Sequence, residues 1–366
     1  MKTNINSIVN PPPPNAKLLK LAIDAHKSFY VVAAMRDNSP KPPQRFVPEA
    51  FLTWVQTRIK EGLQVIACYE AGPLGYVLHR KLTALGATNY VVRPRDWDDN
   101  RKKRKTDRWD AKSMLNALDR FLAGNPDALC LVRVPTEDQE QRRSLVRLRE
   151  SFKGEVKRLA QRARGIALNY GFSLRGTWHG PRTWPHIKPT LPEWLQHLLE
   201  PLRQSVGALQ EQLDKLENEI QALAPAQLPV GIGPLTWVIL ESEICDWHRF
   251  DNRRQVASLT GLTPGEDSSG DRRHLGPISK CGNPRVRQSL CEAAWRLLRF
   301  QASYHLVRKW YANTPRTTSA PAWRKRQIAA LARGLAVDWW RLRTGQTTPE
   351  KLGLKMNSGD KRPKAN

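Results

Sequence analysis

The sequence lacks any apolar run approaching the roughly 20 residues that a membrane-spanning helix needs, and its N-terminus is polar and then proline-rich, unlike a signal peptide. Its five cysteines are odd in number and include no C-x-x-C pair, which argues against a disulfide framework and a zinc site. Acidic residues are also scarce, because 34 Asp and Glu stand against 60 Lys and Arg, for a net charge of +26. We therefore expect a cytoplasmic protein with reduced cysteines, no membrane partner, and a nucleic acid as its main partner.

The chain is long enough, at 366 residues, for two or three domains that each have a core. Its composition and patterning divide it into five segments. We expect a disordered leader over 1–16, an α/β domain over 17–136, a coiled-coil helical region over 137–226, a mainly helical domain over 227–345, and a flexible basic tail over 346–366.

The expected α/β domain alternates short apolar runs with helical patterns. Residues 18–24 and 29–35 are apolar and β-branched and are separated by the polar AHKS, which predicts a hairpin. The pattern then predicts a helix over 51–59, a strand over 64–70, a helix over 73–85, a strand over 89–94, a helix beginning at Asp107, and a strand over 130–135. Such alternation predicts a mixed α/β sheet with helices on its faces.

Four acidic residues lie at the ends of these elements. Asp24 and Glu70 end two strands, whereas Asp107 and Asp110 lie three residues apart in the first turn of a helix that Thr106 caps. Converging carboxylates suit a hard divalent cation such as Mg²⁺, with Mn²⁺ as a substitute, so the four acids outline a two-metal site for phosphoryl transfer. Each acid taken alone could equally cap a turn or begin a helix.

The central helical region carries two apolar stripes. Over 142–168 the stripe lies opposite a ridge rich in Lys and Arg, and from Leu202 to Leu223 apolar residues recur with the alternating spacing of a coiled-coil seam. Two such helices can pair as a hairpin within one chain or join two chains, and the sequence leaves both arrangements open.

The mainly helical domain contains two patterns suited to binding phosphate. Gly231 and Gly233 flank Ile232 before an apolar helix, a pattern like the hairpin of helix-hairpin-helix modules, whose backbone amides bind phosphate. Farther along, Ser268 and Ser269 lie in a glycine-flanked stretch among basic residues. A serine hydroxyl there could attack a phosphate, or the stretch could be a surface turn that binds one.

Two groups of basic residues are predicted to contact the phosphate backbone of nucleic acid. One group immediately precedes Asp107, and the other follows Ser269. Lys and Arg in such groups neutralise phosphates and release their counterions. The first group is Arg101, Lys102, Lys103, Arg104 and Lys105, and the second is Arg272, Arg273, Lys280, Arg285 and Arg287.

Five segments, taken in order, resemble one family: the DEDD-type insertion-sequence transposases, related to Piv-like invertases and to bridge-RNA-guided serine recombinases. Together they span most of residues 18–310. The segments are IDAHK (23–27), YEAGPLGYVLHRKL (69–82), KTDRWDAKSM (105–114), GIGPLTWVILESEI (231–244) and FDNRRQVASLTGLTPGEDSSGDRRHLGPISKCGNPRVRQSL (250–290).

The resemblance implies a RuvC-like, RNase H-type fold for the α/β domain and a C-terminal transposase domain with a serine nucleophile. It places that nucleophile on Ser269 and an acidic tetrad on Asp24, Glu70, Asp107 and Asp110. It implies DNA strand exchange in which the serine hydroxyl attacks a phosphate that acid-bound Mg²⁺ ions polarise. It also implies donor and target DNA selected by a bridge RNA, a homodimer that assembles into a tetramer, and a prokaryotic protein associated with the nucleoid when active.

Two other functions fit the same residues. A RuvC-like, junction-resolving nuclease would use the four acids and a water molecule, with Ser269 only binding phosphate. A non-catalytic nucleic-acid-binding protein would use the acids for structure alone. We rank both behind the recombinase, because a binding module has no evident need for acids at all four positions.

Overall fold

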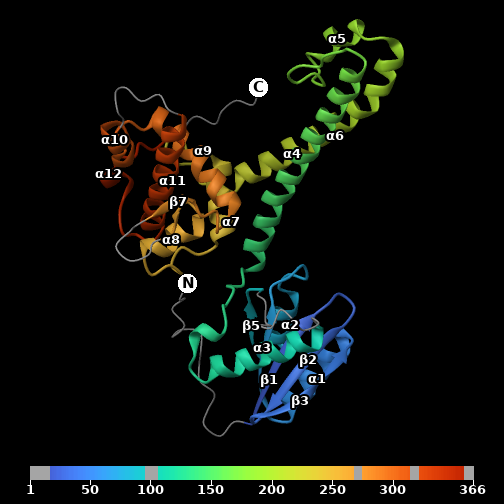
Figure 1. The fold of residues 1–366 in the computed structure, drawn as a ribbon, viewed down its shortest axis with the longest axis vertical. Coiled ribbons are helices and arrows are strands. Elements are labelled where there is room, and N and C mark those ends of the chain that lie inside the picture. The colour runs from blue at the N-terminus through green and yellow to red at the C-terminus, as the bar shows by residue number, and fades with distance from the viewer. Residues whose placement is uncertain (1–16, 95–105, 268–273, 314–320, 358–366) are drawn as a thin grey trace. The chain divides into compact units, whose positions relative to one another are not determined.

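The computed structural model describes residues 17–94, 106–267, 274–313 and 321–357 (Figure 1). The chain divides into two compact units, Met1–Val134 and Pro135–Asn366. The leader expected over 1–16 lies outside the described residues. Within the described part of the chain, no helix combines the length and the apolar character needed to cross a membrane.

The first unit is built on a five-stranded mixed sheet with the strand order β3-β2-β1-β4-β5. The strands are β1 (Leu18–Ala25), β2 (Tyr30–Arg36), β3 (Ser39–Phe46), β4 (Gln64–Glu70) and β5 (Thr88–Val92). β1 and β2 form the predicted antiparallel hairpin, whereas β4 pairs in parallel with both β1 and β5. The predicted mixed α/β sheet is therefore confirmed.

Two details of the sheet differ from the prediction. β3 was not predicted, because its sequence SPKPPQRF contains three prolines. Proline cannot donate a ladder hydrogen bond, but β3 lies at the edge of the sheet, where only one side of a strand has to pair. The strand predicted over 130–135 is instead a single antiparallel bridge between Leu131 and Val92.

Helices cover both faces of this sheet (Figure 1). Alternate strand residues point to opposite faces. Ile23 of β1 therefore shares a core with α1 (Pro48–Lys60) and α2 (Val77–Ala84), whereas Ala22 shares a second core with α3 (Asp107–Leu122). The short helix η2 (Pro126–Ala128) completes the core on the α3 side.

Two long helices begin the second unit and lie side by side (Figure 1). They are α4 (Glu137–Asn169) and α6 (Glu193–Ala222), joined by a segment that contains α5 (Trp184–Ile187) and η3 (Lys188–Thr190). At the joined end, Trp178 and Trp184 are buried between the two helices. Of the two arrangements that the sequence left open, the structure contains the hairpin within one chain.

The rest of the second unit is mainly helical, as predicted. Its elements are α7 (Pro234–Ile244), α8 (Arg253–Thr260), β6 (Pro264–Glu266), β7 (Leu275–Ile278), α9 (Pro284–Phe300), α10 (His305–Ala312), α11 (Pro321–Arg343) and α12 (Pro349–Leu352). Residues of α7 through α12 share one apolar core, in which Leu240, Leu290 and Leu335 are almost completely buried.

Residues 346–357, which we expected to begin a flexible tail, are packed against this core. Leu352 and Leu354 are both buried in it. The backbone carbonyl of Lys355 accepts a hydrogen bond from the backbone N–H of Val230, and Pro229 bridges to Met356. Two leucines and backbone pairing thus order a stretch whose composition is polar, while residues 358–366 lie outside the described residues.

Candidate functional site

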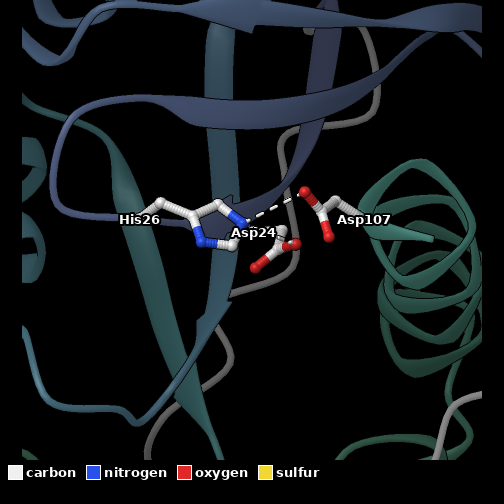
Figure 2. Close-up of side chains that lie close together, drawn as sticks. All are labelled: Asp24, His26 and Asp107. Atoms are coloured by element: carbon white, nitrogen blue, oxygen red, sulfur yellow. Dashed lines mark hydrogen bonds and ion pairs between the residues drawn. The ribbon is translucent and has the colours of Figure 1, made fainter. Parts of the chain in front are cut away.

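Asp24 at the end of β1 and Asp107 at the start of α3 lie close together, and the ring of His26 faces both carboxylates (Figure 2). Nε2 of His26 is 3.3 Å from Oδ2 of Asp24 and 3.4 Å from Oδ2 of Asp107. One ligand atom from each of these three residues lies within 4.8 Å of the other two. We call Asp24, His26 and Asp107 the β1–α3 cluster.

The packing of α3 on the sheet brings these residues together. Lys20 and Ala22 of β1 both face α3, because Lys20 forms an ion pair with Asp119 and Ala22 lies in the α3 core. Asp24 continues this alternate series, so its side chain also lies on the α3 face. Asp107 is the first residue of α3, where the helix dipole stabilises a negative charge.

Glu70 ends the strand next to β1, on the same face of the sheet. In the parallel pairing of β1 and β4, Ile23 is opposite Tyr69, and continuing this register places Asp24 beside Glu70. Cys68 of β4 belongs to the α3 core, so the alternation points Glu70 toward α3 as well. Glu70 is only partly buried, and its carboxylate lies outside the β1–α3 cluster.

The electrostatics of Asp24 reflect the nearby acids. Burial raises the pKa of the Asp24 carboxyl above its ordinary value, His26 opposes this rise, and the negative charges of Asp107 and Asp110 add to it. Asp110 therefore acts on the same site, although it is not a member of the β1–α3 cluster. Such a concentration of negative charge is relieved when a cation binds.

His26 is a residue that sequence reasoning missed. The prediction assigned it to the polar turn of a hairpin, whereas its ring stacks near Phe29, at 4.5 Å between ring centroids, and faces two carboxylates. The spacing Asp-x-His at the end of a strand was the available signal. His26 is the first residue after β1, so its ring stays close to Asp24 near the end of that strand.

The residues present fit a hard divalent cation. Asp24 and Asp107 supply carboxylate oxygens, with Glu70 and Asp110 near by, and His26 supplies one imidazole nitrogen. Carboxylate oxygens are donors that suit Mg²⁺ and Mn²⁺. The assignment of these residues as metal ligands stays a prediction.

The surroundings of the β1–α3 cluster include a second feature that sequence reasoning missed. Trp109 is 53% exposed on α3, between Asp107 and Asp110 in the sequence, and Nζ of Lys112 is 5.8 Å from its ring centroid. An exposed indole beside a cation is a surface on which a nucleobase can stack. The predicted basic residues Arg101, Lys102, Lys103, Arg104 and Lys105 lie outside the described residues.

The predicted serine nucleophile also lies outside the described residues, as do Ser268, Arg272 and Arg273. The strands on either side of that stretch are described. β6 and β7 pair in antiparallel fashion, with Glu266 opposite Leu275, and the backbone N–H of Asp267 donates to the carbonyl of His274. The sequence that contains Ser269 is thus bounded by a paired hairpin.

Two of the predicted basic residues after β7, Arg285 and Arg287, have protein partners. Nε of Arg285 donates to Oε2 of Glu150 at 2.5 Å, and Nη1 of Arg287 donates to the backbone carbonyls of Thr260 and Lys280 at 3.2 Å each. Lys280 is exposed and has a left-handed backbone, with φ of 54°. Contact of these three residues with a phosphate stays a prediction.

Gly231 and Gly233 lie in a tight turn that leads into α7. Gly231 has φ of +92°, and a Cβ there would lie 3.4 Å from the backbone of Arg296 on α9. Ile232 is buried, and its backbone N–H donates to the carbonyl of Pro229. Gly231 therefore allows the turn to pack closely on α9, and phosphate binding by the turn is untested.

Clustered acids on an α/β sheet, in a chain with a net charge of +26, are the features of a protein that acts on nucleic acid. The protein-family model described as "Transposase IS116/IS110/IS902 family" matches residues 227–308. The chain is 32% identical over 305 residues to the candidate transposase y4rJ of Sinorhizobium fredii, covering 75% of this chain and 76% of that one. The chain belongs to the IS116/IS110/IS902 family of transposases.

Two further relatives are named for the elements they serve. The chain is 27% identical over 233 residues to the transposase for insertion sequence element IS1111A of Coxiella burnetii, covering 60% of this chain and 62% of that one. It is 28% identical over 244 residues to the transposase for insertion sequence element IS1328 of Yersinia enterocolitica, covering 63% and 70%. The predicted membership in an insertion-sequence transposase family is thereby confirmed.

Proposed function

We propose that this protein cleaves and rejoins the DNA of an insertion sequence, with Ser269 as the nucleophile and Mg²⁺ or Mn²⁺ held by four acids. The observation that carries the proposal is the β1–α3 cluster, in which carboxylates from two distant segments lie within 4.8 Å of each other and of His26. Together with family membership, this arrangement favours a nucleic-acid enzyme over a binding module. The four acids of the proposal are Asp24, Glu70, Asp107 and Asp110.

The chain's own groups divide the work. Asp24 and Asp107 would hold the cation together with Nε2 of His26, which lies 3.3 and 3.4 Å from their Oδ2 atoms, and Glu70 and Asp110 would complete the acidic set. A divalent cation, when bound there, neutralises a phosphate oxygen and the charge that develops on the leaving oxygen. Trp109 gives an unpaired base beside the scissile phosphate a surface to stack on.

Ser269 carries the covalent step of the proposal. A bond forms between its Oγ and the phosphorus, the bond from phosphorus to the departing strand oxygen breaks, the hydroxyl proton passes to solvent, and the departing oxygen takes up a proton from solvent. A hydroxyl of the incoming strand then attacks the same phosphorus and displaces Oγ. The number of phosphoester bonds is unchanged throughout, so strand exchange needs no external energy source.

Three further parts of the proposal come from the family resemblance. A RuvC-like topology is supported by the opening antiparallel hairpin followed by parallel strands, with acids at the ends of β1 and β4. Selection of DNA by a bridge RNA is consistent with a net charge of +26. Dimers that assemble into a tetramer are supported by Leu209 and Leu216, which remain partly exposed on the α6 seam.

The test measures cleavage and joining of DNA that carries the element's ends, in the presence of the guide RNA and Mn²⁺. We expect Asp24→Asn and Ser269→Ala each to abolish both reactions, whereas Ser258→Ala, a control on the exposed side of α8, keeps them. A nuclease that uses water would still cut after Ser269→Ala, and that result would contradict the proposed nucleophile. Unaltered cleavage by Asp24→Asn would contradict the proposed metal site.

A further inference from the structure

The second unit contains a cavity of about 580 Å³ between α8, α10 and α11. Its volume falls within the range of about 300–1,000 Å³ that is typical of small-molecule and cofactor sites. Among the described residues, none that was predicted to be catalytic or to contact nucleic acid lines it. We call it the α8–α11 cavity.

Positive charge gathers around the opening of the α8–α11 cavity. Arg253 and Arg254 from α8 and Lys309 from α10 are exposed, and Arg333 from α11 is partly buried. No carboxylate in the described part of the chain forms an ion pair with any of these four side chains. By contrast, Arg341, which also lines the cavity, is paired with Asp338. The opening therefore suits an anion.

The interior of the cavity has a different chemistry. Leu331 is 4% exposed, Leu306 is partly buried, and the indole of Trp310 lies 5.9 Å from that of Trp323 between ring centroids. These apolar and aromatic groups suit the face of a planar ring. The ligand that matches both regions has an anionic end and a flat, largely apolar end.

Asp338 is a carboxylate in the lining of the cavity, and it already has partners. Asp338 is 2% exposed, and its Oδ2 accepts a hydrogen bond from the hydroxyl of Tyr304 at 2.8 Å and lies 2.5 Å from Nε2 of His305. Arg341 is its third partner, so this carboxylate is already compensated, and the positive charge without an acidic partner among the described residues lies at Arg253, Arg254 and Lys309. The anionic end therefore lies at the opening, and the planar end lies inside.

We propose that the α8–α11 cavity receives one unpaired nucleotide of a nucleic-acid strand. Its phosphate lies at Arg253, Arg254 and Lys309, and its base lies against Trp310. A cavity of about 580 Å³ has room for one extruded nucleotide and none for a duplex. The inference rests on the proposed function in one respect, since that function makes nucleic acid the substrate.

The test compares the binding of three duplexes to the full-length protein without divalent metal. One duplex is fully paired, one has a single unpaired 2-aminopurine nucleotide, and one has an abasic residue at the same position. We expect the duplex with the unpaired base to bind about tenfold more tightly than the other two, because base stacking on an aromatic side chain contributes affinity of that order. Equal affinity for all three would overturn the proposal.

Variants show whether the preference arises in the α8–α11 cavity. Trp310→Ala removes the stacking surface, and Ala330→Trp, at an exposed lining position on α11, blocks the opening without disturbing the core. We expect each variant to abolish the preference for the unpaired base. If Trp310→Ala does not fold, Ala330→Trp tests the proposal by itself. Arg254→Gln weakens binding of the duplex with the unpaired base severalfold, whereas Arg324→Gln, at an exposed position of α11 outside the lining, leaves this binding unchanged.

Two controls separate this inference from its alternatives. Adenosine monophosphate is added as a competitor at millimolar concentration. If it binds as tightly as the duplex with the unpaired base, the site is one for free nucleotides and the proposal is wrong. Asp24→Asn is expected to keep the preference, because the assay contains no metal and needs no cleavage. Failure of the catalytic proposal therefore leaves this result unchanged.

Discussion

Asp24→Asn separates a metal-holding carboxylate from a structural one. In the metal-free protein the ligand oxygens of Asp24 and Asp107 lie within 4.8 Å of each other. Two unit charges at that distance repel by about 3.5 kcal/mol at an effective dielectric constant of about 20. Their side chains are 26% and 52% exposed, and solvent screening reduces this repulsion to about 1 kcal/mol.

The substitution has a small effect without metal and a large one with metal. Without metal, it removes this repulsion together with the contact to His26, so the free energy of unfolding should change by no more than about 1 kcal/mol. With Mn²⁺ at about one hundred times its dissociation constant, the wild-type protein gains about 2.7 kcal/mol of stability. For a unit of this size, that gain raises its melting temperature by about 10 °C.

Thermal unfolding followed by circular dichroism, with and without Mn²⁺, measures both effects. We expect Asp24→Asn to lose most of the metal-dependent rise, because a neutral amide is a weaker ligand than a carboxylate. Asp127→Asn, at an exposed acid of the same unit, should keep the rise. An unchanged rise in Asp24→Asn, or no rise in the wild-type protein, would refute the reasoning.

Two further predictions concern the second unit. Burial raises the pKa of Glu243, but hydrogen bonds, led by that from Arg147, outweigh it and hold the pKa below its ordinary value. This stabilisation is therefore complete above about pH 4.5 and is lost as the pH falls through the folded-state pKa. Because the side chain of Arg147 is 46% exposed, we expect Arg147→Met to lower the free energy of unfolding by about 2 kcal/mol at pH 7 and by less at pH 4, as measured by urea unfolding. An equal loss at the two pH values would contradict the ion pair. Gly282→Ala places a Cβ 2.3 Å from the carbonyl oxygen of Leu259 and should destabilise the unit by about 2 kcal/mol. In Gly207→Ala on α6 the added Cβ meets nothing within 4 Å, so this variant should stabilise the unit by about 0.5 kcal/mol. Urea unfolding of both variants measures these changes.

Local patterns were sufficient to predict the sheet and most helices. The apolar runs of β1, β2, β4 and β5 are short and buried, so their hydrophobicity marks them directly. β3 was not predicted because proline is unfavourable in most strands, although a strand at the edge of a sheet tolerates it. The packing of residues 346–357 was not predicted because it depends on partners such as Val230, which lies more than a hundred positions earlier in the chain.

The candidate site was predictable in part for a similar reason. Strand ends and a helix start indicated the positions of the acids, since these are local features. His26 could be assigned only once α3 lay against β1, because its second partner, Asp107, is remote in sequence. From the sequence, Arg285 was expected to be available to a phosphate because it lies in a basic stretch. In the structure it contacts Glu150 of α4, which is 135 residues away in the chain.

The most direct test of the proposed chemistry is to trap DNA on the purified protein and identify the attached residue by mass spectrometry. With Mn²⁺, guide RNA and element-end DNA, we predict a nucleotide linked through phosphate to the Oγ of Ser269, and no such species in Asp24→Asn. Cleaved DNA without any protein–DNA link, or a link at another residue, would contradict serine-mediated strand exchange.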